Sequence, residues 1–348
     1  MRVYKLGAVP WARSQLVYHA LAELGQEALV LCWPSEPYVC LGYHQDVEQE
    51  IDQSYCRAQG LPIFRREVGG GGVYLDRDQL FWQLIISPDN PAAPRRRDVF
   101  YRRFLGPVIA HYRELGVMAE FTPVSDVTVA GRKICGTGAG EVGPMWVFVG
   151  NLMLDFDRRA MARVIQAPDE NFRRRFEAGM AAHLTSLAAE LGPERAAGLD
   201  RAALMDALAA QFAQVLGPLA PAASDRELEA KVAQVGARML APDWLRFPRK
   251  ASPVRRVKLR AGVFLEQREI RASKGLLRAC YLLHDDRLRQ VELAGQGVAA
   301  DSGALAKLAA GLEGLAWPQA QARMETWLAQ REDRGPPPAG DRLTGLGS

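Results

Sequence analysis

The chain has 348 residues, of which 48% are hydrophobic and 24% are charged, an ordinary composition for a globular protein with room for two domains. Its formal net charge of +4 is too small to indicate a nucleic-acid-binding surface by itself. No apolar stretch approaches the length of a membrane-spanning helix, and the N-terminus lacks the features of a secretory leader. We therefore expect a cytoplasmic protein without nucleic-acid or membrane partners.

The sequence begins with a helical pattern and then alternates strands with helices. Helical spacing of apolar residues predicts helices over residues 12–24, 47–59 and 99–116. Short apolar runs bounded by Pro or Gly predict strands over residues 28–33, 38–42, 61–64 and 81–86. Further along, residues 127–135 are typical of a hairpin around Ala130-Gly131, and residues 147–154 of another strand.

The second half changes character twice. Residues 158–239 are rich in Ala, Leu, Arg and Glu and favour helices, among them 200–216. Prolines cluster in residues 241–254, after which three strands (257–270, 276–283, 288–293) and two helices (303–312, 318–331) are predicted. We predict an α+β fold with a large, mixed or antiparallel-sheet domain (1–241), a small βββαα domain (255–332) and a disordered tail (333–348).

The five cysteines are odd in number and form no Cys-x-x-Cys pair, and the five histidines are scattered. These patterns argue against a disulfide framework and against a structural zinc site. The cysteines are Cys32, Cys40, Cys56, Cys135 and Cys280.

Residues 65–76, Arg-Arg-Glu-Val-Gly-Gly-Gly-Gly-Val-Tyr-Leu-Asp, are the most informative segment. Four consecutive glycines cannot stabilise a helix or a strand interior, but they let a ligand approach bare backbone and let N–H groups face an anion. Arg65 and Arg66 supply donors that suit phosphate or carboxylate. The alternative is a flexible loop, but the strand-like flanks favour a shaped site for a large anionic ligand.

A second segment, residues 125–140, leads from Ser125-Asp126 through Lys133 into a glycine-rich stretch. Gly138 to Gly143 formally match G-x-G-x-x-G, but a β-rich run follows where the dinucleotide fingerprint requires a helix. A P-loop motif is absent from the sequence. Strand alternation would place Lys133 and Cys135 on one face. Lys133 then contacts an anion or lies exposed at a sheet edge, and the pattern alone leaves both open.

The two segments together resemble the lipoate–protein ligase family, which is related to biotin ligases and octanoyltransferases. Residues 65–76 are similar to the family's Arg-Arg-x-Ser/Thr-Gly-Gly-Gly motif, and residues 125–136, with Val149-Gly150-Asn151, to its Gly-Arg-Lys-Ile motif and following strand. Gly42-Tyr43-His44-Gln45 resembles a third motif of the family, Gly-Arg-x-Gln. The likeness spans residues 1–240, and the following segment has the place and size of the family's accessory domain.

Four positions depart from the family pattern, namely Val68, Leu75, Ser125 and Val149. The first lacks the usual hydroxyl, and the last replaces a histidine. Such departures put substrate preference in doubt more than the reaction. They suggest a divergent branch with its own carrier protein, for example one of the sulfur-oxidation type.

The resemblance implies that lipoate and ATP form lipoyl-adenylate, and that the acyl group then passes to a lysine of a carrier domain. It implies that Lys133 bridges the carboxylate and α-phosphate, and that Arg65 or Arg66 neutralises the triphosphate. Mg²⁺ would assist, with Asp126 as a candidate ligand. The remaining residues implied to bind lipoate, octanoate or adenylate are Gly69, Gly70, Gly71, Val73, Tyr74, Leu75, Asp76, Gly136 and Gly150.

Two rival functions remain open. An octanoyltransferase of the same fold needs no ATP and forms an acyl-thioester, for which Cys135 is the candidate nucleophile. The alternative is that Cys135 is a small buried apolar residue, since a single cysteine is weak evidence for a nucleophile. The second rival is a non-catalytic protein that binds lipoate or its carrier, which the departures allow and the intact Lys133 opposes.

Overall fold

A computed structural model describes residues 1–246, 252, 254–272, 275–296 and 302–332. Within these residues the chain forms two compact units. The first runs from Met1 to residue 246 and includes Leu259–Ala261, and the second comprises the remaining described residues from 252 onward. The predicted disordered tail, 333–348, lies outside the described residues.

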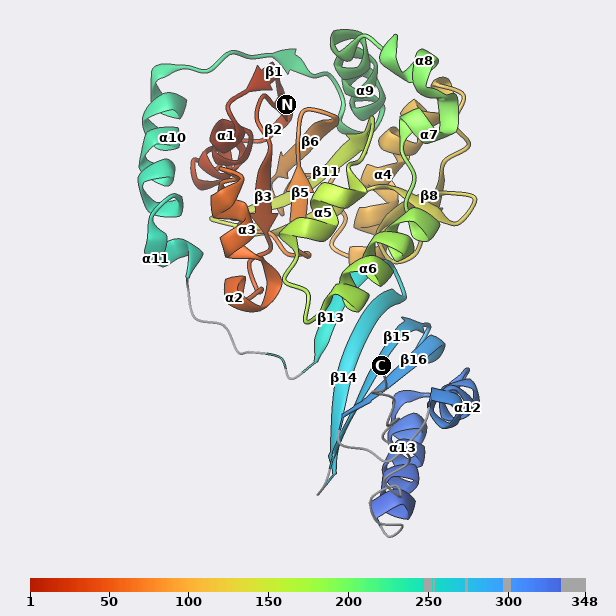
Figure 1. The fold of residues 1–348 in the computed structure, drawn as a ribbon. Coiled ribbons are helices and arrows are strands. Elements are labelled where there is room, and N and C mark those ends of the chain that lie inside the picture. The colour runs from red at the N-terminus through yellow and green to blue at the C-terminus, as the bar shows by residue number, and fades with distance from the viewer. Residues whose placement is uncertain (247–251, 253, 273–274, 297–301, 333–348) are drawn as a thin grey trace, which may run out of the picture. The chain divides into compact units, whose positions relative to one another are not determined.

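The first unit is built on a mixed six-stranded sheet (Figure 1). Its strands, in spatial order, are β10 (Thr137–Val142), β11 (Met145–Met153), β6 (Gln79–Ile86), β2 (Ala28–Pro34), β1 (Arg2–Val9) and β12 (Ala220–Pro221). The β12–β1–β2 pairs are parallel, and the β2–β6–β11–β10 pairs are antiparallel. The prediction of an α+β fold with a mixed sheet is confirmed.

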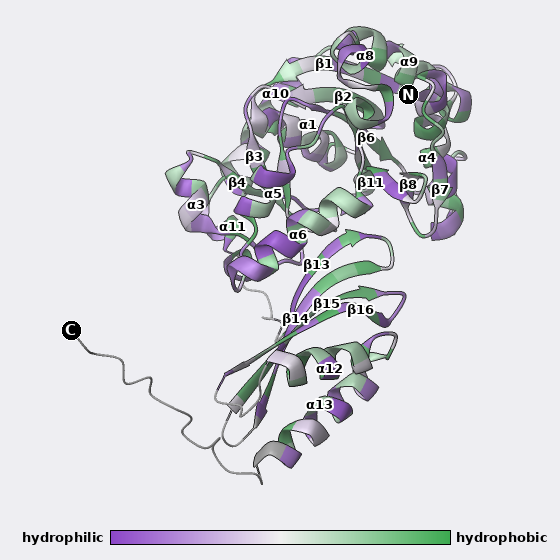
Figure 2. Cartoon of the chain, turned by 45° about the vertical axis from the view of Figure 1, so that its right-hand side comes forward, coloured by the Kyte–Doolittle hydropathy of each residue, from purple (hydrophilic) through white to green (hydrophobic). Residues whose placement is uncertain are grey.

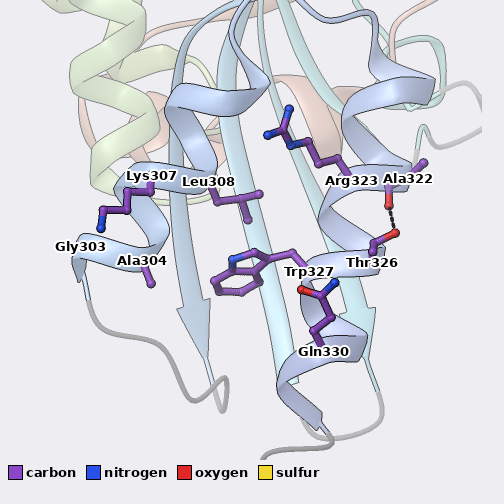
Figure 3. A pocket seen from close by; sticks show the side chains of 9 residues that line it. All are labelled: Gly303, Ala304, Lys307, Leu308, Ala322, Arg323, Thr326, Trp327 and Gln330. Atoms are coloured by element: carbon purple, nitrogen blue, oxygen red, sulfur yellow. Dashed lines mark hydrogen bonds between the residues drawn. The ribbon is translucent and has the colours of Figure 1, made fainter.

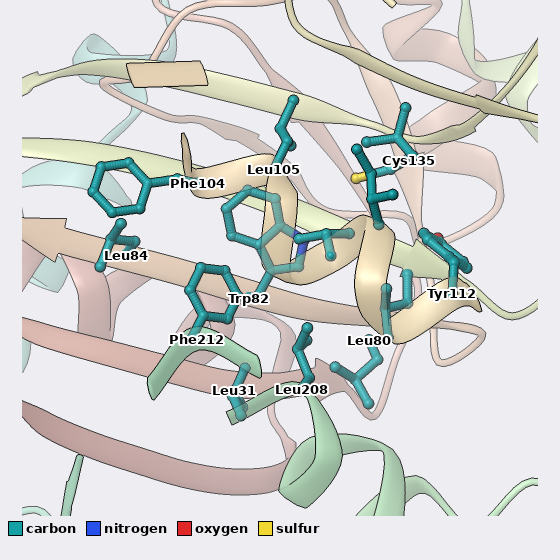
Figure 4. Packing of buried hydrophobic residues seen from close by; sticks show 14 of the residues in the cluster. Leu31, Leu80, Trp82, Leu84, Phe104, Leu105, Tyr112, Cys135, Leu208 and Phe212 are labelled. Carbon is teal, nitrogen blue, oxygen red and sulfur yellow. The ribbon is translucent and has the colours of Figure 1, made fainter. Parts of the chain in front are cut away.

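Helices cover both faces of this sheet. On one face α1 (Trp11–Glu23) packs beside α10 (Arg226–Met239), and on the other α4 (Arg97–Glu114) packs beside α9 (Arg201–Leu216). Figure 4 shows Trp82 in the second of these layers, between Phe212 and the side chains of α4. Because both faces are buried, β2 is a continuous apolar run, and β6 is buried along its whole length although it includes Gln79 and Gln83.

Two small three-stranded sheets complete the strands of the first unit. One has the order β4 (Ile63–Arg65), β3 (Tyr38–Leu41), β5 (Val73–Leu75), and the other has the order β7 (Glu120–Thr122), β8 (Asp126–Val129), β9 (Arg132–Cys135). The predicted hairpin at Ala130-Gly131 is confirmed. Both turn residues have positive φ, 48° and 75°, as a two-residue hairpin turn requires.

The helices differ in part from the prediction. The stretch 47–59 is two short helices, α2 (Val47–Glu50) and α3 (Gln53–Ala58), because Ile51 pairs with Ile165 and the Asp52 carboxylate caps the second helix. The remaining helices of the unit are α5 (Arg158–Val164), α6 (Glu170–His183), α7 (Leu187–Leu191), α8 (Pro193–Ala197) and α11 (Pro242–Leu245). Figure 2 colours α6 largely hydrophilic, in keeping with its narrow buried stripe.

Among the described residues from 254 onward, four strands occur where three were predicted. They are β13 (Arg255–Arg260), β14 (Val263–Ala272), β15 (Gly275–His284) and β16 (Arg287–Gln296), followed by α12 (Ser302–Leu312) and α13 (Trp317–Glu332). The stretch 257–270 was expected to be one strand, but Gly262, with φ +71°, turns the chain inside it. The fold of these residues is therefore ββββαα.

A groove of about 850 Å³ runs between α12 and α13. Figure 3 shows Trp327 in this groove, with Lys307 and Arg323 on the two helices that border it. Among the helices that the structure describes, none combines the length and the apolarity needed to cross a membrane.

Candidate active site

The glycine loop, Gly69–Gly72, connects β4 to β5 and is held by close backbone approaches. A Cβ on Gly42 would lie 2.0 Å from the carbonyl oxygen of Gly70, so no side chain fits there. Gly70 has φ +109°, a conformation that favours glycine. In contrast, a Cβ on Gly71 would have no neighbour within 4 Å. The loop therefore presents bare backbone to open space at Gly71.

The second glycine segment is strand β10, on which the glycine loop lies. The Gly69 amide donates to the carbonyl of Ala139 at 3.2 Å. A Cβ on Gly138 would lie 3.0 Å from the Gly69 carbonyl oxygen, and one on Gly140 would lie 3.2 Å from the Val68 Cα. The small residues of β10 thus let the loop lie flat against the sheet. No helix follows β10, in agreement with the rejection of the dinucleotide fingerprint.

Both arginines of the motif are buried, with 1% of Arg65 and 7% of Arg66 exposed. The Arg65 guanidinium donates to the carbonyls of Gly42, Tyr43, Gln45 and Leu245. That of Arg66 donates to the carbonyls of Gly69, Gly71 and Cys40. The donors expected to bind phosphate are engaged with backbone oxygens instead. In this structure the two arginines hold the loop in shape.

Lys133, on β9, lies against Asp126, on β8. Its Nζ is 2.9 Å from the Asp126 Oδ1, and the two side chains are 15% and 1% exposed. A lysine at a solvated sheet edge would be far more exposed. The burial of Lys133 therefore favours the other interpretation, in which its ammonium contacts an anion. Because β9 passes through Gly136 directly into β10, Lys133 lies on the same stretch of chain that carries the glycine loop.

Cys135 does not share the face of Lys133, contrary to the prediction. Lys133 pairs with Thr128 and Cys135 with the adjacent Val127, so Ile134 is an extra residue in β9. This bulge breaks the alternation and turns Lys133 and Cys135 to opposite faces. Figure 4 shows Cys135 in the hydrophobic core near Leu105 and Tyr112.

Burial raises the pKa of the Cys135 thiol to about 12, an effect that outweighs the opposing influence of Lys133. The other four cysteines are buried as well. Burial also raises the pKa of Cys32, Cys40 and Cys56. A thiolate nucleophile therefore has no favourable position in this structure.

Two amide side chains connect the walls of the site, Gln79, which was not predicted to be there, and Asn151, which was named only as part of a motif. Asn151 Oδ1 accepts from the Gly136 amide at 2.7 Å, and Asn151 Nδ2 donates to Gln79 Oε1 at 2.7 Å. Gln79 Nε2 in turn donates to the Tyr74 carbonyl at 3.2 Å. The sequence does carry a signal for this chain of hydrogen bonds. Gln79 and Asn151 are polar residues in β6 and β11, two strands that are otherwise mostly apolar.

The residues that follow the glycine loop differ in how far their side chains are exposed. Val73 and Tyr74 are half-buried, and burial raises the pKa of Tyr74 to about 12. Burial also raises the pKa of the Asp76 carboxyl. Leu75 is 9% exposed and belongs to the core beneath β3 and β5, so its side chain packs rather than lining the site. A Cβ on Gly150 would lie 2.3 Å from Trp82 and 2.9 Å from the Gly136 carbonyl oxygen.

Two of the four departures from the family pattern, Val68 and Val149, lie near one another. Val68 is fully buried in the core, and its Cγ2 would lie 3.4 Å from a Cβ on Gly138. The Cγ2 of Val149 would lie 3.6 Å from the same Cβ. Ser125 lies in the turn directly before β8, and its carbonyl accepts from the Thr137 hydroxyl at 3.1 Å. An apolar pair thus lies under the glycine loop where a hydroxyl and an imidazole were expected.

The residues described do not build a metal cage. No group of three His, Cys, Asp or Glu side chains that could hold an ion occurs among them. Asp126, the expected Mg²⁺ ligand, is almost fully buried against Lys133. The arrangement does not favour a direct metal contact at Asp126, since Mg²⁺ demands a hydrated octahedral shell.

Comparison with known proteins places these features in a family context. Residues 7–213, more than half of the chain, match the family model of the lipoyl protein ligase A/B catalytic domain. The chain is 28% identical over 164 residues to octanoyltransferase LipM of Geobacillus kaustophilus, covering 40% of this chain and 59% of the relative. It is 30% identical over 132 residues to lipoate–protein ligase 1 of Staphylococcus aureus, covering 38% of this chain and 39% of the relative.

The match is longer for another octanoyltransferase LipM, that of Kyrpidia tusciae, with 25% identity over 66% of this chain and 90% of the relative. Against the first two relatives the chain spans only 59% and 39% of their length. Both kinds of relative, ligases and octanoyltransferases, are thus similar to this chain at comparable identity.

Solved structures share the fold. The bipartite lipoate protein ligase of Thermoplasma acidophilum superposes with a TM-score of 0.62 at 20% identity, over 72% of this chain and 98% of that one. LipL1 of P. falciparum in complex with lipoate gives a TM-score of 0.56 at 11% identity, over 94% of this chain and 99% of that one. The fold class that the sequence resemblance implied is confirmed.

Proposed function

Because the chain belongs to the family of lipoyl protein ligase A/B catalytic domains, we propose that it is an ATP-dependent lipoate–protein ligase. It activates lipoate, or octanoate, to an acyl-adenylate and transfers the acyl group to a lysine of a lipoyl-carrier protein or domain. The observation that carries the proposal is the buried ion pair of Lys133 and Asp126, whose Nζ and Oδ1 are 2.9 Å apart. Lys133 lies on β9, which continues into β10, the strand against which the glycine loop packs.

In the first step an oxygen of the lipoate carboxylate attacks the α-phosphorus of ATP, and the bond to the leaving pyrophosphate breaks. Two anions must approach each other, so a cation between them lowers the barrier. Lys133 supplies a compact charge on a flexible stem, which suits a group that has to follow the charge from ground state to transition state. Asp126 holds the ammonium in place until the ligand arrives.

The glycine loop supports the same step by geometry. Gly71 exposes backbone without a side chain, so a nucleotide phosphate or an acyl chain can lie close to it. Mg²⁺ would enter with the triphosphate, because the described residues supply no cage for it.

In the second step the amine of a carrier lysine attacks the acyl carbonyl carbon. An amide bond forms, the bond to AMP breaks, and the amine gives up a proton. The half-buried Val73 and Tyr74 border the adenylate in this proposal.

A second candidate function is an ATP-independent octanoyltransferase. The 90% coverage of the LipM relative from Kyrpidia tusciae favours it. The buried cysteines weigh against it, because the reaction needs a thiolate that can reach the substrate, and Cys135 lies in the core. A non-catalytic binding protein is the third candidate, and it gives no reason for a buried lysine on β9 that is paired with Asp126.

One assay separates these functions. Purified protein is incubated with lipoate, ATP and a lipoyl-domain acceptor, and pyrophosphate release and the mass of the acceptor are followed, with and without ATP. The ligase requires ATP for both signals. Acyl transfer from an octanoyl carrier without ATP identifies the transferase. Lipoate binding without turnover from any acyl donor identifies the binding protein.

A further inference from the structure

The tripeptide Arg65-Arg66-Glu67, directly before the glycine loop, is held by a segment that lies outside the family match. That match ends at residue 213, whereas Arg238, Trp244 and Leu245 all contact the tripeptide. The sequence boundary predicted at residue 241 also falls inside this segment. Figure 1 shows α10 beside α1, with α11 at its end.

The strongest contacts join α11 to Arg65. The Trp244 indole Nε1 donates to the Arg65 carbonyl at 2.9 Å. In return the Arg65 guanidinium donates to the Leu245 carbonyl at 2.7 and 3.1 Å. Backbone and side chain of the same buried arginine are therefore both tied to two consecutive residues of α11.

Arg65 passes this constraint to the glycine loop. Its guanidinium also binds the carbonyls of Gly42 and Tyr43, at 3.3 and 3.0 Å. Gly42 in turn lies so close to Gly70 that a Cβ on it would be 2.0 Å from the Gly70 carbonyl oxygen. A displacement of α11 would thus move Gly42 against the loop.

A second route runs through Glu67. Its carboxylate lies 3.2 Å from the Arg238 guanidinium, which also binds Glu23 at 2.6 Å and lies over the Trp244 ring at 5.3 Å. The Glu67 amide donates to the buried His19 Nε2 at 3.1 Å. Arg238 and Trp244 therefore contact both each other and the tripeptide.

We propose that residues 238–245 are a positioning element for the glycine loop, with Trp244 as the positioning residue. Trp244 fixes the backbone of Arg65, and Arg65 fixes the loop that receives the substrates. The inference rests on the proposed function for its kinetic test, and a second test is independent of activity.

The test compares Trp244→Phe with Trp146→Phe. The first variant keeps an aromatic ring beside Arg238 but removes the donor to Arg65. The second removes an indole of similar size that packs near Phe100, on the other face of the sheet. In Trp244→Phe we expect the KM for ATP or lipoate to rise about five-fold, the size expected for one neutral hydrogen bond, with kcat changed less. Trp146→Phe should keep both constants.

Amide hydrogen exchange supplies the second readout. The amides of residues 66–72 should exchange about five-fold faster in Trp244→Phe than in the parent, and at the parent's rate in Trp146→Phe. Equal exchange rates and equal KM values in the two variants overturn the inference. A purely structural indole at position 244 would change the melting temperature, as at position 146, without a specific effect on residues 66–72 or on KM. If the parent protein releases no pyrophosphate, the proposed function fails, while the exchange comparison still decides the positioning role.

Discussion

Two buried carboxylates, Asp126 in the first unit and Glu266 in the second, face cations of different kinds. Asp126 is 1% exposed and lies against the ammonium of Lys133, a flexible point charge. Glu266 is 0% exposed, and it binds two guanidinium groups, from Arg256 and Arg268, and accepts from the Tyr281 hydroxyl at 2.8 Å. Arg268 and Tyr281 are further fixed against the ring of Trp317.

The difference agrees with the proposed role of Lys133 at the reacting groups and with a structural role for the Glu266 cluster. Planar guanidinium forks and a stacked ring fix the Glu266 cluster in a single arrangement. A lysine can instead swing from its carboxylate to a ligand. We therefore expect changes at Lys133 to affect turnover more than stability, and changes at Glu266 to do the reverse.

The largest effect is expected for Lys133→Ala. Loss of the cation between two approaching anions should lower the rate of pyrophosphate release by at least about a hundredfold. Lys5→Ala is the matched control, since Lys5 also pairs with an aspartate, Asp206, but with side chains 37% and 66% exposed. Full activity of Lys133→Ala, in protein whose circular dichroism is unchanged, contradicts the assignment.

The next effect concerns acid stability of the first unit. Burial lowers the pKa of His19 from 6.5 to about 3, so between these pH values the unfolded chain binds a proton that the folded chain does not. The contribution of neutral His19 is complete above pH 6.5. As the pH falls below it, the free energy of unfolding should decrease by up to about 1.4 kcal/mol per pH unit.

Unfolding of the parent and of His19→Gln, measured from pH 7 to pH 4, tests this expectation. The variant should show the weaker pH dependence. Parallel curves for the two proteins would mean that His19 is protonated in the folded state as readily as in the unfolded one.

A smaller effect is expected in the second unit. Glu266→Ala leaves two arginines without their shared carboxylate and should destabilise this unit by about 2 kcal/mol, less than for a fully buried pair because Arg256 is 45% exposed. The control is Glu269→Ala on the same strand, whose carboxylate is 38% exposed and pairs with Arg271 and Arg278. Thermal unfolding reports the loss, and KM for ATP should stay at the parent value in both variants.

The smallest effect is expected for Cys135→Ser. A buried thiol replaced by a hydroxyl should cost about 1 kcal/mol of stability, with pyrophosphate release within about two-fold of the parent. Loss of all acyl transfer in a folded Cys135→Ser protein would favour the octanoyltransferase instead. Together with Lys133→Ala, this variant decides which of two neighbours in the sequence acts on the substrate.

The sequence predicted the elements whose signals are local. The turn at Ala130-Gly131, the apolar stripe of 99–116 and the glycine run all have patterns that short-range physics explains. The bulge at Ile134 could not be predicted, because alternation of two residues gives no sign of an extra one. The partners of Arg65 and Arg66 are backbone carbonyls, and a carbonyl has no signature in the sequence.

The same limit applies to the chain from Gly136 through Asn151 and Gln79 to Tyr74, which joins residues far apart in sequence. The contact of Trp244 with Arg65, on which its proposed role rests, was not predicted for a related reason. The prolines in residues 241–254 predicted a boundary between domains. Composition alone does not show that the first residues of this boundary, Trp244 and Leu245, bind Arg65.

The bulge in β9 has a consequence for how chemistry could change within this fold. Lys133 and Cys135 face opposite ways only because Ile134 is accommodated as an extra residue. Restoring regular pairing by slipping the strand one position would turn the thiol toward the lysine without altering either residue. In an evolving lineage or a designed variant, a shift of strand register would thus bring a cysteine to the face of Lys133, where we propose that the acyl group binds, and a point substitution would not.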